Sequence, residues 1–137
     1  MDYRRIRHLW IAVDFDGMLV RERWPEVGEE MPGALEALRN FHADLHYLVL
    51  NTCRKGDLLR EAAAWLKHRG VYGLFESVNR NSRRRCAMFG GVDVRKISAD
   101  VYLDDRNIPP VPRMANGDVN WRVIERMVQA EAERDVA

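Results

Sequence analysis

Near its beginning the chain reads Leu9-Trp10-Ile11-Ala12-Val13-Asp14-Phe15-Asp16-Gly17. Five apolar residues in a row predict a buried strand of a parallel sheet. Asp14 and Asp16 would then emerge at the carboxyl end of that strand, where open α/β sheets bind their ligands. Alternation along the strand points both carboxylates to one side and Phe15 to the other. Such close carboxylates repel unless a cation lies between them or one is protonated, so the pair predicts an active site.

The bulk composition indicates one soluble domain. The chain has 137 residues, enough for a single domain over 1–137 with a proper core. Its 22 basic and 21 acidic residues nearly cancel, which gives no global electrostatic reason to expect a nucleic-acid or membrane partner. Two cysteines are too few for a disulfide framework, and no apolar run approaches the ~20 residues that cross a bilayer. Residues 1–5 begin no signal peptide, so we expect a cytoplasmic protein.

Short apolar runs alternate with amphipathic segments along the chain, as in a parallel sheet covered by helices. We therefore predict an α/β fold, a three-layer Rossmann-like arrangement with a mostly parallel sheet flanked by helices. The expected strands are 9–13, 46–50, 74–78 and 101–103. The expected helices begin at Pro32-Gly33, span about 57–69 with Asp57 as N-cap, and span about 118–134. Gly70 is placed to end the second helix, and residues 79–93 and 107–116 are expected to be loops.

Polar residues follow three of the predicted strands. Asp14 and Asp16 end the first, Thr52 follows the second, and Asp104 and Asp105 end the last. In a parallel sheet these three ends lie side by side on one edge. Four carboxylates that converge there require a hard cation with oxygen ligands, for which Mg²⁺ is the usual choice. A magnesium site with a hydroxyl and a nearby lysine suits the binding of a phosphoryl group.

Four motifs, taken together, resemble those of the haloacid dehalogenase (HAD) superfamily of phosphotransferases. They are Val13-Asp14-Phe15-Asp16-Gly17-Met18, Leu50-Asn51-Thr52, Lys96 and Tyr102-Leu103-Asp104-Asp105. The resemblance covers nearly the whole chain in order and spacing. It implies an HAD-like fold. The connections 16–32 and 79–93 are too short to fold alone, so the chain resembles a small member of the family without a separate cap domain.

The resemblance implies a Mg²⁺-dependent phosphatase that acts on a small phosphorylated substrate. Asp14 would be the nucleophile that forms an aspartyl-phosphate, and Asp16 would act first as the acid and then as the base. The metal ligands would be Asp14, the backbone carbonyl of Asp16, and Asp104 with help from Asp105. Thr52 would donate a hydrogen bond to a phosphoryl oxygen.

The same resemblance implies a cation that offsets the charge of the phosphate. Lys96 is the candidate, as a catalytic and substrate-binding residue, and Lys55 and Arg54 are the alternatives. Cys53 and Arg54 directly follow Thr52 and are further candidates for substrate binding.

Several alternatives stay open from the sequence. An open, capless site either accepts large substrates or is closed by a second copy of the chain, so a homo-oligomer is a reasonable hypothesis. The arginines between Arg80 and Arg85 could grip a polyanion, which would favour a nucleic-acid-end phosphatase or a phosphotransferase. A catalytically silent HAD-fold binding module is the third possibility. The sequence does not identify the substrate.

Overall fold

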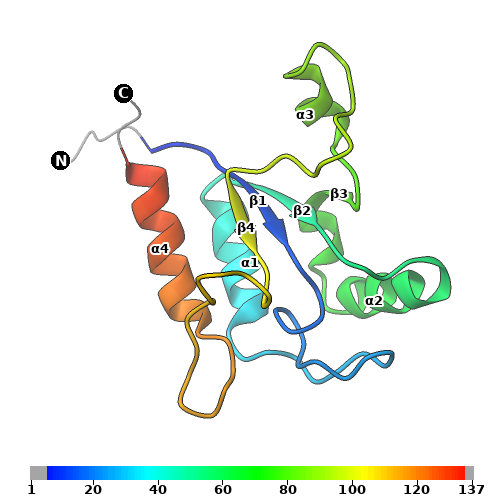
Figure 1. The fold of residues 1–137 in the computed structure, drawn as a ribbon, viewed down its shortest axis with the longest axis vertical. Helices are drawn as coiled ribbons and strands as arrows, with labels where there is room; N and C mark the ends of the chain where they lie inside the picture. Colours follow the sequence, from blue (N-terminus) through cyan, green and yellow to red (C-terminus); the bar gives the residue numbers. More distant parts are fainter. Residues whose placement is uncertain (1–5, 135–137) are drawn as a thin grey trace.

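The computed structural model describes residues 6–134, which form a four-stranded parallel sheet with helices packed against it (Figure 1). The strands are β1 (Trp10–Val13), β2 (Tyr47–Leu50), β3 (Phe75–Val78) and β4 (Val101–Leu103), in the order β3-β2-β1-β4. The helices are α1 (Ala34–Ala43), α2 (Gly56–His68), α3 (Arg83–Ala87) and α4 (Trp121–Glu133), with a short 3-10 helix, η1 (Tyr72–Leu74). The predicted α/β class is confirmed, and this sheet is entirely parallel.

Each strand agrees with its prediction to within one residue, because the apolar runs are short and clearly bounded. β1 lies in the middle and pairs with both β2 and β4. Val13 is in register with Leu50 on one side and with Leu103 on the other. The three strands therefore end at the same level, and the residues that follow them meet at one edge of the sheet.

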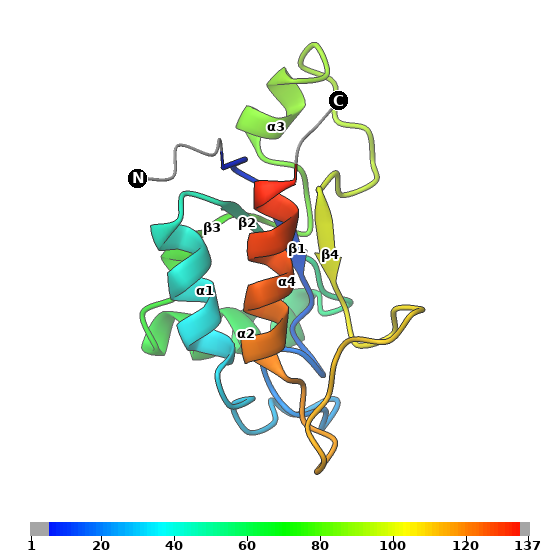
Figure 2. The ribbon, with the colours of Figure 1, turned by 90° about the vertical axis from the view of Figure 1, so that its left-hand side faces the viewer.

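One face of the sheet carries the hydrophobic core. Alternate strand residues such as Ile11, Val13 and Leu48 are fully buried there. The apolar sides of α1, α2 and α4 pack into the same cluster, which includes Trp121, Ile124 and Val128 of α4. Figure 2 shows α1 and α4 side by side in front of the strands.

Cationic side chains, rather than apolar helix faces, cover the other face of the sheet. It carries three aromatic residues, which are Trp10, Tyr47 and Tyr102. The cations that cover them are Arg85 over Trp10 at 5.1 Å, Arg84 over Tyr47 at 5.3 Å and Lys96 over Tyr102 at 5.5 Å. Among the helices within residues 6–134, α3 alone lies against this face. The third layer of the predicted three-layer arrangement is thus reduced to α3 and the loop after it.

Two helix predictions need correction. The N-cap of α2 is Lys55, not Asp57, which lies inside the first turn, where its negative charge favours the positive end of the helix dipole. The short helix α3 falls within residues 79–93, where a loop was predicted. It begins with Ser82, whose hydroxyl accepts a hydrogen bond from the Arg85 N–H.

Other details agree with the sequence predictions. Gly70 follows α2 with φ +73°, the left-handed conformation expected of a glycine that ends a helix. The last helix begins at Trp121, three residues later than predicted, with Asn120 as its cap. Across residues 6–134, none of the helices combines the length and the apolar character that crossing a bilayer requires. The prediction that no signal peptide is present concerns residues 1–5, which lie outside the described range.

Candidate functional site

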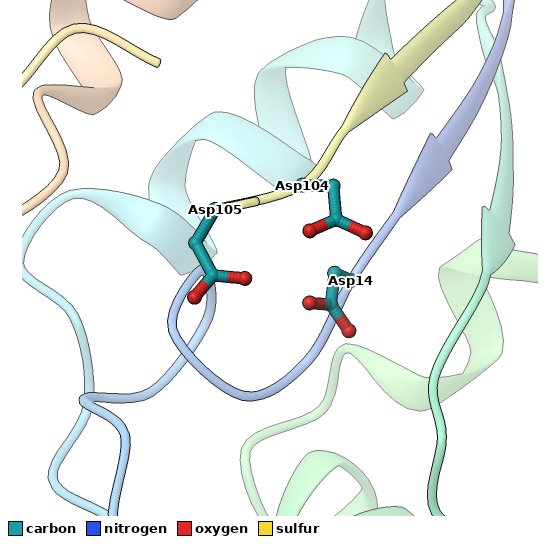
Figure 3. Close-up of side chains that lie close together, drawn as sticks. All are labelled: Asp14, Asp104 and Asp105. Atoms are coloured by element: carbon teal, nitrogen blue, oxygen red, sulfur yellow. The ribbon is translucent and has the colours of Figure 1, made fainter. Parts of the chain in front are cut away.

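Three aspartates converge where β1 and β4 end (Figure 3). Because Val13 and Leu103 are paired in register, the next residues, Asp14 and Asp104, emerge next to each other. The Asp14 N–H extends the ladder by donating to the Leu103 carbonyl at 2.9 Å. Carboxylate oxygens of Asp14, Asp104 and Asp105 all lie within 4.8 Å of one another. The predicted convergence of the two strand ends is therefore present in the structure.

The cluster is electrostatically strained without a cation. The pKa of Asp14 is raised from 3.8 to about 8, first by burial, then by the charge of Asp104 and by a hydrogen bond and charge from Asp105. The Phe15 N–H donates to Asp14 Oδ1 at 2.8 Å, and this hydrogen bond lowers the pKa of Asp14. Its effect is smaller than the combined effect of burial and the neighbouring carboxylates. Burial and the neighbouring carboxylates therefore favour a protonated cluster in the absence of metal. A divalent cation would relieve the same repulsion by replacing that proton.

A tight turn after β1 leaves the space that Asp105 occupies in the cluster. The Phe15 carbonyl accepts hydrogen bonds from the N–H groups of residues 18–20, and Gly17 adopts φ +83° within this turn. A Cβ atom at Gly17 would overlap the Asp105 carboxylate. Glycine is needed at position 17 both for its left-handed backbone and for the space that Asp105 occupies.

Gly17→Ala is expected to destabilise the protein and to displace Asp105. The left-handed backbone alone costs alanine about 1–2 kcal/mol, and the overlap with Asp105 adds to this cost. Gly70→Ala is the matched control, because φ is +73° there and an added Cβ meets nothing within 4 Å. Thermal unfolding with and without Mg²⁺ measures both effects. Only Gly17→Ala should lose stabilisation by Mg²⁺, and equal Mg²⁺ responses in the two variants would contradict this account.

Asp16 lies beside the cluster but faces another partner. Arg54 Nε donates to Asp16 Oδ2 and Arg54 Nη2 donates to Asp16 Oδ1, both at 2.8 Å. Arg54 is fully buried, and its remaining donors reach the carbonyls of Glu26 and Leu58. Its guanidinium also lies between the rings of Phe15 and Trp24. The prediction that Arg54 binds substrate stays a prediction, and in this structure its guanidinium is buried and bonded to protein groups.

A hollow of about 270 Å³ opens at the three aspartates. Its lining residues are Asp14, Asp16, Glu22, Trp24, Asn51, Thr52, Cys53, Asp104, Asp105 and Arg106. All the predicted site residues except Arg54 and Lys96 are in this set. Glu22, Trp24, Asn51 and Arg106 were not predicted as site residues. The position of Arg106 directly after the acidic pair is the one sequence signal for it, but its place in the hollow depends on a turn, as that of residues 22–24 depends on how their loop folds back.

Thr52 lines the hollow, and two hydrogen bonds hold it in place. Its N–H donates to Asn79 Oδ1 at 2.8 Å, and its Oγ1 accepts from the Arg54 N–H at 3.1 Å. The hydroxyl is the acceptor in this second bond, so its own hydrogen can still be donated to a ligand. This geometry is compatible with the predicted role of Thr52, which stays a prediction. Cys53 is exposed beside it.

Lys96 does not line this hollow, and its catalytic and substrate-binding role stays a prediction. It lies over Tyr102 in the segment before β4, at the amino end of the sheet, whereas the hollow is at the carboxyl end. Lys55, the alternative, is exposed at the start of α2 and does not line the hollow. Among the lysines and arginines of residues 6–134, Arg106 is the one that lines the hollow. The seven residues between Lys96 and Asp104 include the whole of β4, which places the two residues at opposite ends of that strand.

The residues present fit a divalent cation better than a softer metal. Three carboxylates offer only hard oxygen donors, which Mg²⁺ and Ca²⁺ prefer. The one nearby sulfur belongs to Cys53, which is exposed at the rim and outside the cluster. The backbone carbonyl of Asp16, predicted as a further ligand, stays a prediction.

Comparison with known proteins gives a relative of similar size. No family model matches the chain, and no curated protein matches it. A solved structure described as that of a conserved protein from Bacteroides thetaiotaomicron is 36% identical in sequence, with a TM-score of 0.74. The alignment covers 90% of this chain and 91% of the Bacteroides chain. At that identity over nearly both full lengths, the chain belongs to the same protein family as the conserved Bacteroides thetaiotaomicron protein.

Proposed function

We propose that the chain is a Mg²⁺-dependent phosphatase of the HAD type that works through an aspartyl-phosphate on Asp14. The observation that carries this proposal is the cluster of Asp14, Asp104 and Asp105, with oxygens within 4.8 Å of one another at the end of two parallel strands. Burial, and after it repulsion within the cluster, raise the pKa of Asp14 to about 8, and buried charge of this kind is costly unless it serves a ligand.

Asp14, Asp104 and Asp105 would hold Mg²⁺, which, when bound, supplies positive charge that keeps Asp14 ionised and draws the phosphoryl group to it. The ionised carboxylate of Asp14 attacks phosphorus. A new bond forms between phosphorus and Asp14, and the ester bond to the leaving oxygen breaks. Water then attacks the same phosphorus, breaks the bond to Asp14, and releases inorganic phosphate.

The leaving oxygen needs a proton, and the attacking water must lose one. Asp16 and Glu22 are the carboxylates outside the cluster that line the hollow. Asp16 belongs to the same turn as Asp14, two residues further along the chain, so we assign it both transfers. Both of its oxygens accept from Arg54 in this structure. Asp16 must therefore turn away from Arg54 before it can act as an acid. We infer that this rotation is part of the catalytic cycle.

Two residues are positioned to bind the phosphoryl oxygens. The Thr52 hydroxyl can donate one hydrogen bond, as argued above. We assign to Arg106 the cationic role that was predicted for Lys96, because Arg106 lines the hollow. Its backbone N–H donates to Asp104 Oδ1 at 2.9 Å, which holds the residue beside the acidic cluster. A guanidinium pairs well with a phosphate dianion.

The test is removal of the metal. The purified protein with Mg²⁺ should release phosphate from an aryl phosphate, EDTA should reduce the rate to that of the buffer, and added Mg²⁺ should restore it. Protein quenched in acid during turnover should carry phosphate that hydroxylamine removes, as expected of an acyl phosphate. Activity that persists in EDTA would refute the metal requirement. Inactivity on a broad panel of phosphate esters, with Mg²⁺ bound, would instead identify a binding module.

A further inference from the structure

The charges of this chain are segregated. Residues 76–96 hold six of the 22 basic residues and only two of the 21 acidic ones, so the rest of the chain carries 16 basic and 19 acidic residues. The net charge of +1 conceals this division. The basic segment contains α3 and the loop after it, which stand beyond the starts of β1 and β4 in both views (Figures 1 and 2). Local charge of this kind attracts an anionic partner even when the whole protein is nearly neutral.

Buried polar residues hold the basic segment in one shape. The side chain of Asn81 donates to Asp93 Oδ1 and to the Lys96 carbonyl, both at 2.9 Å, and accepts from the Ser98 N–H at 2.8 Å. Arg85 is buried against Trp10 and donates to Ser98 Oγ at 3.0 and 3.2 Å. The segment is therefore an ordered projection, tied together at its base.

The basic segment combines exposed cations with exposed apolar side chains. Arg80, Arg83 and Arg84 line a hollow of about 820 Å³. Four large apolar side chains are exposed nearby in the sequence, and they are Met88 (62%), Phe89 (42%), Val92 (59%) and Val94 (42%). Solvent-exposed apolar residues gathered in seven consecutive positions mark an interaction surface.

This combination favours a lipid surface over a nucleic acid. Single-stranded nucleic acids need open aromatic rings on which bases stack. Each ring at this end of the sheet already has an arginine over it: Arg84 lies over Tyr47, and Arg85 lies over Trp10 and, at 5.6 Å, over Phe89. Phe89 is the one of these rings that also stays exposed, and a single ring is not a platform for successive bases. Phosphate-binding cations beside exposed aliphatic and aromatic side chains are instead the features of proteins that bind the interface of an anionic bilayer.

We propose that residues 80–96 dock the protein on an anionic phospholipid bilayer. Arg80 and Arg83 contact the phosphates of the head groups, while Met88, Phe89, Val92 and Val94 enter the boundary of the acyl chains. Trp10, covered by Arg85, begins β1, and Asp14 follows its end, so the docking surface and the carboxylate hollow lie at opposite ends of the sheet. The hollow stays open to solvent when the surface is occupied. The proposal does not depend on the proposed phosphatase activity.

The experiment is co-sedimentation of the full-length protein with vesicles of phosphatidylcholine alone or mixed with phosphatidylglycerol. The protein should bind only the anionic vesicles, and binding should weaken as salt is raised. Arg80→Gln/Arg83→Gln should lower the partition coefficient about thirtyfold, at roughly fivefold for each arginine near an anionic surface. Phe89→Ser/Val92→Ser should lower it several-fold at constant charge.

Matched controls change the same residue types elsewhere. Arg122→Gln/Arg126→Gln removes two exposed charges from α4, and Met127→Ser removes an exposed apolar side chain. Both should bind as the unchanged protein does, and circular dichroism should show that every variant is folded. The proposal would be overturned if the protein did not bind anionic vesicles, or if the α4 arginine variant lost as much vesicle binding as Arg80→Gln/Arg83→Gln. It would also be overturned if Phe89→Ser/Val92→Ser bound vesicles undiminished and an oligonucleotide displaced the vesicles. The last result would identify a nucleic-acid surface.

Discussion

Asp14→Asn is expected to lower the rate of phosphate release by a factor on the order of 10⁴ to 10⁶, the loss that follows removal of a catalytic nucleophile. An amide has no anionic oxygen to attack phosphorus, so the acyl phosphate should also vanish from acid-quenched samples. The substitution preserves the shape of the side chain and removes one of three mutually repelling charges. Steady-state rates with saturating Mg²⁺ provide the measurement.

The same variant should have a distinctive stability profile without metal. The pKa of Asp14 is about 8 in the folded protein and 3.8 in the unfolded chain, so between these values the folded state holds a proton that the unfolded state has lost. The metal-free protein therefore loses stability as pH rises from about 4 to 8, and this contribution is fully present only below that window. Asp14→Asn should not show this loss, and Mg²⁺ should reverse it in the unchanged protein.

Asp57→Asn is the control for both measurements. Asp57 is exposed in the first turn of α2 and lies outside the hollow, so its replacement should leave activity and the pH profile of stability nearly unchanged. If Asp14→Asn retains a tenth or more of the activity while it folds normally, Asp14 is not the nucleophile. Parallel stability profiles for Asp14→Asn and the unchanged protein would show that Asp14 is ionised in the metal-free cluster.

The acidic cluster could be predicted from the sequence because a parallel sheet converts order along the chain into proximity in space. Asp14 and Asp104 each follow an apolar run, and once β1 and β4 pair in register their side chains must meet. Strand ends are recognisable without knowledge of the loops. The convergence thus follows from local patterns and one general rule of parallel sheets.

The cationic residues could not be predicted in the same way. Lys96 is near Asp104 in the sequence, but a strand lies between them and carries them to opposite ends of the sheet. The burial of Arg54 depends on the Glu26 carbonyl, from a loop whose course no periodicity reveals. Arg106 directly follows the acidic pair, yet its position in the hollow depends on the turn it begins. For all three residues, the geometry of the connecting segments, rather than the residue type, decides whether the side chain reaches the hollow.

Arg54→Met is expected to lower the free energy of unfolding by about 3–5 kcal/mol, the usual cost of removing one partner from a buried ion pair. Arg54 is fully buried, and the side chain of Asp16 is only 14% exposed. Methionine fills much of the same volume but leaves the Asp16 carboxylate without its two hydrogen bonds. The carbonyls of Glu26 and Leu58 lose their donors as well. Urea unfolding in EDTA measures the loss without any contribution from bound metal.

Two further variants separate two contributions to the stability lost in Arg54→Met: the unpaired charge of Asp16 and the lost packing of the arginine side chain. Arg60→Met removes an arginine whose pair with Asp57 is exposed, and it should cost no more than about 0.5 kcal/mol. Arg54→Met/Asp16→Asn removes the orphaned charge and should recover part of the stability lost in Arg54→Met. A loss in Arg54→Met as small as that in Arg60→Met would mean that water reaches Asp16 and that the pair is not structural.

The size of the expected loss follows from what Arg54 joins. Its guanidinium connects the turn after β1 through Asp16, the loop before α1 through the Glu26 carbonyl, and the first turn of α2 through the Leu58 carbonyl. The first two of these segments contribute Asp16, Glu22 and Trp24 to the lining of the hollow. Arg54 also lies against Trp24, which lines it. Arg54→Met should therefore weaken Mg²⁺ binding in addition to stability, although Arg54 contacts none of the three clustered aspartates, and Arg60→Met should leave Mg²⁺ affinity unchanged.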